Sequence, residues 1–215
     1  DTRRAVAAAL RDERVDIVHL HGLDFHACLP PPGPPALATL HLPPSWYPAE
    51  ALRPSRPGTW LHGVSASQHA ALLDARAEPL LPPVSNGVPV DALGAARHAR
   101  RSFALALGRV CPEKGQHAAL EAARAAGVPL LIGGAVYPYE AHERYFAREV
   151  APRLDRRRRF LGPVGFARKR RLLAAARCLL VPSTAPETSS LVAMEAAACG
   201  TPVVAFACGA LPEVV

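Results

Sequence analysis

Short runs of leucine and β-branched residues alternate along this chain with alanine-rich segments that are long enough to form helices. This alternation is typical of parallel strands joined by crossover helices, and it predicts an α/β fold. The expected strands are 15–20, 36–41, 60–65, 102–108, 128–133, 158–161, 177–182 and 202–206. The expected helices are 2–13, 66–77, 115–126, 139–150, 166–176 and 188–199, with a last one that starts near residue 210.

A proline-rich stretch, PLLPPVSNGVPVDAL, separates two sets of strand–helix units. We place a domain boundary near Asn86, which gives an amino-terminal domain at 1–86 and a carboxy-terminal domain at 87–215. A doubly wound domain has about five or six strands, so the first domain is interpreted as incomplete. The second is interpreted as lacking its last elements, because the sequence stops at Val215 inside an expected helix.

The sequence gives no sign of a membrane span or a signal peptide. No apolar run approaches the roughly 20 residues that a spanning helix needs, and the first residues lead directly into an alanine-rich helix. The cysteines are odd in number, at five, and have no C-x-x-C spacing. This pattern favours buried, reduced thiols in a cytoplasmic protein.

The net charge of +7 comes almost wholly from arginine. Two basic clusters, at 156–159 and 168–171, are interpreted as solvated loop and helix faces. They are also compatible with peripheral contact to anionic lipid heads at the inner face of a membrane. No nucleic-acid motif accompanies them, so a nucleic-acid partner is not expected.

The segment LALGRVCPEKG, residues 105–115, places two cations at a strand–helix turn. The expected strand ends at Gly108, and Arg109 and Lys114 follow it. Open α/β sheets bind ligands beyond the carboxyl ends of their strands, and a guanidinium fork with an ammonium charge suits a diphosphate. The alternative is a pair of ordinary surface cations.

A small polar loop and an apolar helix follow the strand expected at 177–182. With a helix start near Thr188, the backbone N–H groups at 188–191 would be available to an anion. Glu187 can accept hydrogen bonds from sugar hydroxyls, and Glu195 lies about 12 Å further along roughly the same side. That separation suits the two ends of an extended ligand, whereas the alternative is a helix-capping Glu187 and a Glu195 in a structural ion pair.

Several segments together resemble family 4 glycosyltransferases, which are retaining enzymes with two Rossmann-like domains in the GT-B fold. The resemblance covers most of the chain, and its most specific parts are the E-x7-E segment and the GR…EKG turn in combination. The segments are NGV at 86–88, GRVCPEKG at 108–115, LIGGA at 131–135, FLGPVG at 160–165, ETSSLVAMEAAACGTPVV at 187–204 and GALPE at 209–213.

The resemblance implies a site that holds a nucleotide-diphosphate sugar, UDP- or GDP-linked. It assigns Arg109 and Lys114 to the diphosphate, Glu187 to the donor sugar and His41 to the surroundings of the transferred sugar. His19 and His21 end the neighbouring strand and are expected to line the acceptor cleft. The implied donor-binding residues are Gly108, Gly134, Gly162, Pro163, Val164, Thr188, Ser189, Ser190, Leu191 and Glu195.

The chain departs from the family pattern at two places. Thr188, Ser189 and Ser190 stand where many relatives have Gly-Phe-Gly, and the glycine-rich loop of the first strand–helix turn has no counterpart. The resemblance implies retaining transfer of a hexose to an unidentified acceptor, with a glycan or a lipid-linked molecule among the candidates. No D-x-D or His/Asp cluster is present in the sequence, so no metal and no cofactor are expected.

Two other function classes fit the same donor pocket. One is a GT-B epimerase or hydrolase of nucleotide sugars, which needs a general acid or base that faces the anomeric carbon. The other is a non-catalytic nucleotide-binding fragment. A dehydrogenase is disfavoured because no G-x-G-x-x-G follows an expected strand.

Overall fold

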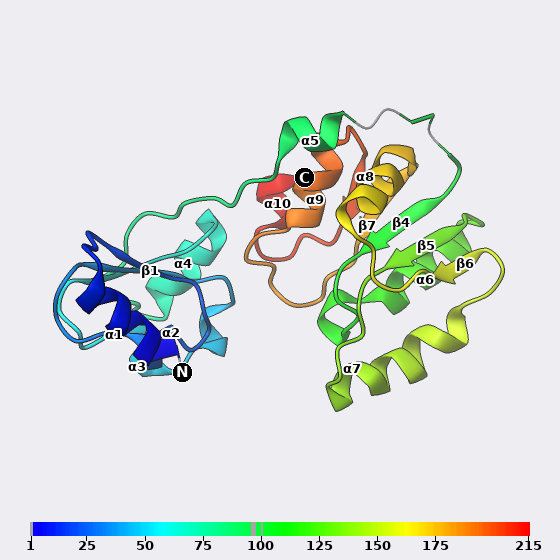
Figure 1. Cartoon of the computed structure of the whole chain (residues 1–215). Helices are drawn as coiled ribbons and strands as arrows, with labels where there is room; N and C mark the ends of the chain where they lie inside the picture. Colours follow the sequence, from blue (N-terminus) through cyan, green and yellow to red (C-terminus); the bar gives the residue numbers. More distant parts are fainter. Residues whose placement is uncertain (1, 96–97, 100) are drawn as a thin grey trace. The chain divides into compact units, whose positions relative to one another are not determined.

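A computed structural model describes residues 2–95, 98–99 and 101–215 of the chain. The chain forms two compact units, which are coloured along the sequence in Figure 1. The first unit consists of Asp1–Asn86 together with Glu187–Ser189, and the second consists of Gly87–Pro186 together with Ser190–Val215.

The first unit contains a parallel sheet of three strands in the order β1-β2-β3. The strands are β1 (Val18–Leu20), β2 (Ala36–Thr39) and β3 (Thr59–His62). The helical elements are α1 (Thr2–Asp12), α2 (Phe25–Cys28), η1 (Pro44–Trp46), α3 (Ala49–Leu52) and α4 (Ala66–Asp74). Phe25, Leu40, Leu61 and Leu72 are almost wholly buried in its core.

The second unit contains a parallel sheet of five strands in the order β6-β5-β4-β7-β8. The strands are β4 (Ala104–Leu107), β5 (Leu130–Gly133), β6 (Arg158–Phe160), β7 (Cys178–Val181) and β8 (Val203–Ala205). The helical elements are α5 (Val90–Gly94), η2 (Pro112–Lys114), α6 (Gln116–Ala125), α7 (Glu140–Tyr145), η3 (Phe146–Val150), η4 (Ala151–Arg153), α8 (Phe166–Ala175), α9 (Leu191–Ala198) and α10 (Leu211–Val214).

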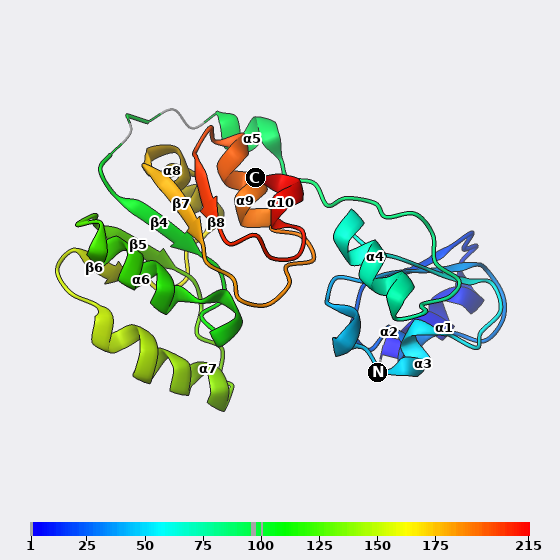
Figure 2. The ribbon, with the colours of Figure 1, turned by 180° about the vertical axis from the view of Figure 1, so that it is seen from behind.

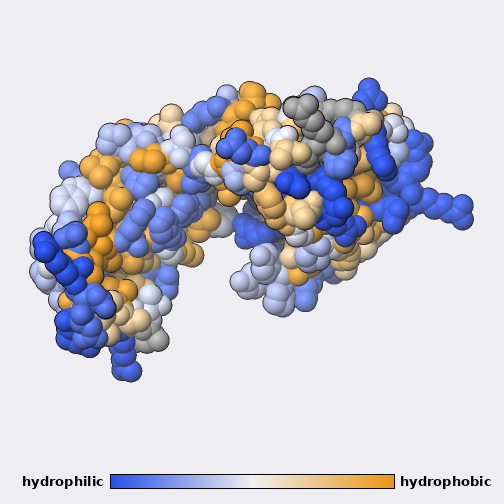
Figure 3. All heavy atoms as spheres, turned by 45° about the horizontal axis from the view of Figure 1, so that its top comes forward, coloured by the Kyte–Doolittle hydropathy of each residue, from blue (hydrophilic) through white to orange (hydrophobic). Residues whose placement is uncertain are grey.

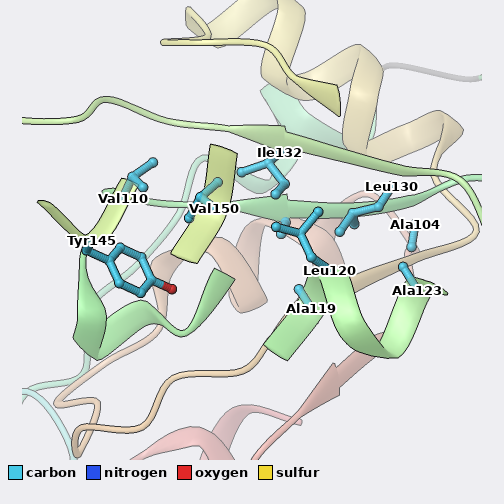
Figure 4. Packing of buried hydrophobic residues seen from close by; sticks show 10 residues of the cluster. Ala104, Val110, Ala119, Leu120, Ala123, Leu130, Ile132, Tyr145 and Val150 are labelled. Atoms are coloured by element: carbon cyan, nitrogen blue, oxygen red, sulfur yellow. The ribbon is translucent and has the colours of Figure 1, made fainter. Parts of the chain in front are cut away.

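Alternate residues of β4 face opposite layers of helices, as the two-residue period of a strand requires. Ala104 and Ala106 pack with residues of α6 and η3, as Figure 4 shows for one face of the sheet. Leu105 packs with residues of α8, α9 and α10 on the other face. The view from behind in Figure 2 shows β8 at the edge of the sheet beside β7. The sheet of the second unit is therefore covered on both faces, which explains its apolar strands.

The predicted α/β fold with parallel sheets is confirmed. Each expected strand is present and is shorter than expected. The helix expected at 139–150 changes at Tyr145 from α7 to the π-helical turn η3. The helix expected from Thr188 begins instead at Leu191. Short helices next to prolines, such as α3 and η1, were not predicted.

All five cysteines are free thiols, in agreement with their sequence pattern. The expectation of burial is correct only for Cys111, since the others are half-buried. Within the described residues, none of the helices is both long enough and apolar enough to cross a bilayer. Figure 3 shows hydrophilic and hydrophobic residues interspersed over the face in view.

Candidate functional site

The strand order of the second unit reverses between β4 and β7. From β4 the chain proceeds outward through β5 to β6, and it then returns to place β7 on the other side of β4. Ligands of open α/β sheets bind at such a switch point, beyond the carboxyl ends of the strands. Arg109 and Lys114 follow β4, and the segment 182–190 follows β7. The structure therefore brings these two predicted parts of the site to one edge of one sheet.

Two glycines allow the loops at this edge to touch. Gly115 adopts φ +60°, and a Cβ there would overlap the carbonyl oxygen of Pro182, which follows β7. A Cβ on Gly134 would overlap the carbonyl oxygen of Gly108 in the same way. Only glycine therefore fits at these two positions, and the tight contacts fix where the β4 turn lies against the loops that follow β7 and β5.

The turn after β4 is held by its own side chains and backbone. The Nε2 of Gln116 donates to Arg109 O at 2.7 Å, and the N–H of Thr184 donates to Glu113 O at 2.9 Å. Arg109 is exposed, whereas Lys114 is half-buried and lines a cavity of about 10 Å³ with Gln116 and Ser183. A space of that size holds about one water molecule.

The amino terminus of α9 differs from the sequence prediction. Ser190 is the N-cap, and its carbonyl oxygen accepts from the N–H groups of Ala193 and Met194, both at 3.1 Å. Of the N–H groups expected at 188–191, only that of Leu191 belongs to the first turn of the helix. The N–H groups that precede the first helical hydrogen bonds are therefore those of residues 191 and 192, so this helix end offers fewer N–H groups to an anion than predicted.

The other residues of the predicted segment, 187–189, belong to the first unit. Glu187, Thr188 and Ser189 are assigned to it by their contacts. Within that unit the Thr188 hydroxyl donates to His41 O at 2.7 Å. Ser190 stays in the second unit, where its hydroxyl is buried and has no hydrogen-bond partner among the described residues.

Glu195 lies in α9 and is almost fully buried, with an exposed fraction of 8%. Its Oε1 is 2.5 Å from the Nζ of Lys169 in α8. Its Oε2 is also buried and finds no partner in the part of the chain that the structure describes. Glu195 therefore forms the ion pair that was one of its two expected roles. Its other carboxylate oxygen can accept a hydrogen bond from a hydroxyl group.

The loops after β5 and β6 bring together the other predicted donor-binding residues. The N–H of Gly134 donates to Gly162 O at 2.9 Å, and Gly162 adopts φ +69°. Val164 lies against Gly133, the last residue of β5, and Pro163 is exposed. Gly108 donates its N–H to Gly133 O at 3.1 Å, so the ends of β4, β5 and β6 form one continuous edge.

In the first unit, histidines gather at the carboxyl edge of the sheet. The Thr39 hydroxyl lies 2.7 Å from His19 Nε2 and 2.6 Å from His62 Nε2. His21 Nδ1 lies 3.0 Å from His41 Nε2, and the two rings are stacked with centroids 5.3 Å apart. The four imidazoles thus form two hydrogen-bonded groups at the ends of three strands.

Burial and neighbouring imidazoles disfavour protonation in this histidine group. The pKa of His41 is lowered by desolvation and then by the charges of His21, His62 and His19. The pKa of His19 is lowered by desolvation and by His21 and His62. His41 and His19 are therefore neutral near pH 7, and a neutral ring can accept a proton or a hydrogen bond.

Sequence reasoning missed the contacts of four residues. Lys169 belongs to a basic cluster that was interpreted as a solvated face, yet it pairs with Glu195. In the same cluster, Arg170 donates to Ala92 O at 2.9 Å. His62 and Thr39 complete the histidine group, and the available signal was that each of the three strands ends within two residues of a histidine, in VHLHG, TLHL and WLHG.

The family comparison bears on the second unit. Residues 101–215 match the family model described as glycosyl transferases group 1. The chain belongs to the group 1 glycosyl transferases. The matched range contains the β4 turn, the β7 loop and α9, which carry the site described above. No curated protein matches the chain.

Solved structures of glycosyltransferases have the same fold. AviGT4, a glycosyltransferase involved in avilamycin A biosynthesis, is 28% identical with a TM-score of 0.72, over 99% of this chain and 62% of that one. Anabaena Alr3699/HepE, solved in complex with UDP-glucose, is 22% identical with a TM-score of 0.79, over 100% and 65%. Sucrose-phosphate synthase from Thermosynechococcus elongatus is 20% identical with a TM-score of 0.76, over 98% and 61%.

These likenesses establish the fold of the group 1 chain as the expected GT-B type, built from Rossmann-like α/β units. The chain spans 62% and 65% of the length of the first two of these structures.

Proposed function

We propose that the chain belongs to a retaining family 4 glycosyltransferase that moves a hexose from a nucleotide-diphosphate sugar to a glycan or lipid-linked acceptor. The observation that carries the proposal is the position of Arg109 and Lys114 in the turn after β4 and of α9 after β7, the two strands of the switch point, in a unit that matches the group 1 family. The UDP-glucose complex of the Anabaena neighbour supports a UDP-linked donor.

The charge of the leaving diphosphate is the main chemical problem in such a transfer. Arg109 offers two parallel donors, Lys114 adds a compact positive charge, and the N–H of Leu191 adds a helix-end dipole. Donors fixed before reaction stabilise developing charge by a few kcal/mol each, because they need no reorganisation. The close contact of Gly115 with Pro182 supplies that rigidity by fixing the turn that carries Lys114.

The nucleotide end of the donor is assigned to Glu195. Its buried Oε2 would accept a hydrogen bond from a ribose hydroxyl, while Lys169 pairs with Oε1 and holds the carboxylate in place. The backbone around Gly162, Pro163 and Val164 would seat the base, and Gly134 supports this loop by donating its N–H to Gly162 O. Glu187 and His41 are proposed to orient the transferred sugar, with no metal ion or cofactor in the reaction.

Calorimetry with UDP, GDP and their sugars tests the proposal on the purified chain. We expect saturable binding of one nucleotide and a loss of about 10- to 100-fold in affinity for Arg109→Ala and Lys114→Ala. Arg148→Ala, which removes an exposed arginine from η3, is the matched control and should bind like the parent. Absence of saturable binding by the parent would reject the donor site.

Product analysis then tests the reaction class. A transferase forms a glycoside only when an acceptor is present, and retention is read from the anomeric configuration of that product. Free hexose without an acceptor would indicate a hydrolase, and an altered sugar on the nucleotide would indicate an epimerase.

A further inference from the structure

Three potential metal ligands lie together beside the β4 turn. One ligand atom each from Cys111, Glu113 and His142 lies within 4.8 Å of the other two. Cys111 and Glu113 belong to the turn that precedes α6, and His142 belongs to α7. The residues are 31 positions apart at most (142 − 111), so no local sequence motif indicates the group.

The backbone fixes each of the three positions. The carbonyl oxygen of Cys111 accepts from the N–H of Lys114 at 3.1 Å, and that of Glu113 accepts from Thr184 at 2.9 Å. The N–H of His142 donates to Tyr139 O at 2.9 Å in the first turn of α7. The three side chains can therefore approach a common point by rotation alone, without movement of their elements.

The surroundings favour an ion over a solvated cluster. Cys111 is 1% exposed, and Glu113 and His142 are half-buried. His142 Nδ1 is buried and has no hydrogen-bond partner among the residues that the structure describes. Buried polar atoms without a partner are uncommon in folded proteins, and a bound ion is one of the usual reasons for them.

We propose that Cys111, Glu113 and His142 bind a divalent transition-metal ion of the Zn²⁺ class. A thiolate, an imidazole and a carboxylate are ligands that Zn²⁺ accepts, at about 2.3 Å for sulfur and about 2.0–2.2 Å for nitrogen and oxygen. Donors around a tetrahedral ion of that size are about 3.3–3.8 Å apart, so ligand atoms that lie within 4.8 Å of one another must draw together by about 1–1.5 Å at most. On binding, the Cys111 thiol loses its proton to solvent, and a water molecule completes the fourth position.

Such an ion joins two elements that follow the neighbouring strands β4 and β5. It ties η2, which contains Lys114, to α7 on the neighbouring crossover. The ion therefore holds the β4 turn against α7, and this role is distinct from the metal-free transfer chemistry proposed above. Its presence does not depend on which nucleotide sugar the protein uses.

Co²⁺ is the probe, because it reports both geometry and ligand type by its absorption. We expect the EDTA-treated full chain to bind a single Co²⁺ with a near-ultraviolet thiolate charge-transfer band, and Zn²⁺ to displace it. Cys111→Ser should abolish the charge-transfer band, and Glu113→Gln and His142→Gln should weaken Co²⁺ binding by at least about 10-fold.

Two matched controls separate the site from non-specific binding. Cys178→Ser removes a different thiol, which is half-buried. His69→Gln removes another histidine whose Nδ1 is buried and has no partner among the described residues. Both should keep the Co²⁺ band and affinity. The proposal is overturned if the parent shows no charge-transfer band or if the band survives in Cys111→Ser. It is also overturned if His142→Gln binds Co²⁺ as tightly as the parent does.

Discussion

The two units present the same kind of edge with different chemistry. In both, parallel strands end side by side, and their following loops carry the polar residues. The edge of the first unit is made of imidazoles that hydrogen-bond to one another and to Thr39. The edge of the second is made of closely packed glycine loops, a helix end and full charges such as Lys169 and Glu195.

This difference separates two ways of building a polar site. At the second edge the backbone is locked by contact and the buried charges are paired, which suits a permanently anionic ligand such as a diphosphate. At the first edge the pKa values of His19 and His41 are lowered, so these rings are neutral near pH 7 and gain a proton only as the pH falls, which makes their hydrogen bonds depend on pH. We therefore expect mutations to act mainly through packing and ion pairing in the second unit, and through proton binding in the first.

The largest effect is expected at Gly115. Gly115→Ala places a methyl group on the carbonyl of Pro182 at φ +60°, so the loops after β4 and β7 must separate. We expect the free energy of unfolding of the second unit to fall by about 3 kcal/mol or more in urea denaturation.

Gly127→Ala is the matched control for this variant. Gly127 has nearly the same conformation, φ +64°, but nothing lies within 4 Å of the added Cβ. It should lose only about 1 kcal/mol from backbone strain. Equal losses in the two variants would show that loop contact does not determine the rigidity of the second edge.

The next effect is expected for the ion pair at Glu195. Lys169→Met leaves the Glu195 side chain, which is 10% exposed, without its partner. We expect the free energy of unfolding to fall by about 2 kcal/mol. This loss is below the range for a fully buried pair because Lys169 is 24% exposed. Adding Glu195→Gln removes the stranded charge and should restore part of the stability. A double variant no more stable than Lys169→Met would contradict the pairing.

Sequence periodicity predicted the strands and most helices because it reports local burial, which the final fold preserves. Arg109 and Lys114 were placed at the carboxyl end of β4 by the same reasoning. The start of α9 was missed because Thr188, Ser189 and Ser190 are all residue types that commonly cap a helix. Only Ser190 lies directly before the first helical residue. Partners that are 26 residues apart, such as Lys169 and Glu195, depend on how α8 packs against α9, which no local pattern records.

Acidification should distinguish the two units. The folded-state pKa values of His19 and His41 are lowered, so their contribution to stability is present above the unfolded pKa of about 6.5 and is lost as the pH falls below it. In the second unit, the hydrogen bond from Arg158 lowers the pKa of Asp155 to about 2. Its contribution is present above the unfolded value of 3.8 and is lost only as the pH falls toward 2.

Hydrogen exchange at a series of pH values measures this difference separately in each sheet. Between pH 7.5 and 5 we expect protection, corrected for intrinsic exchange, to decline in β2 and to change less in β5. A parallel decline in both sheets would remove the distinction between a titrating edge and a fixed one.

The smallest effect is expected at His21, which is exposed and contacts His41 by one hydrogen bond. His21→Asn keeps a short polar group there but removes the charge that disfavours protonation of His41. The pKa of His41 should rise in an NMR titration and stay below its ordinary value, because desolvation is the larger cause of the shift. His69→Gln in α4 is the control and should leave the pKa of His41 unchanged. An unchanged His41 pKa in His21→Asn would show that His21 does not influence protonation of His41.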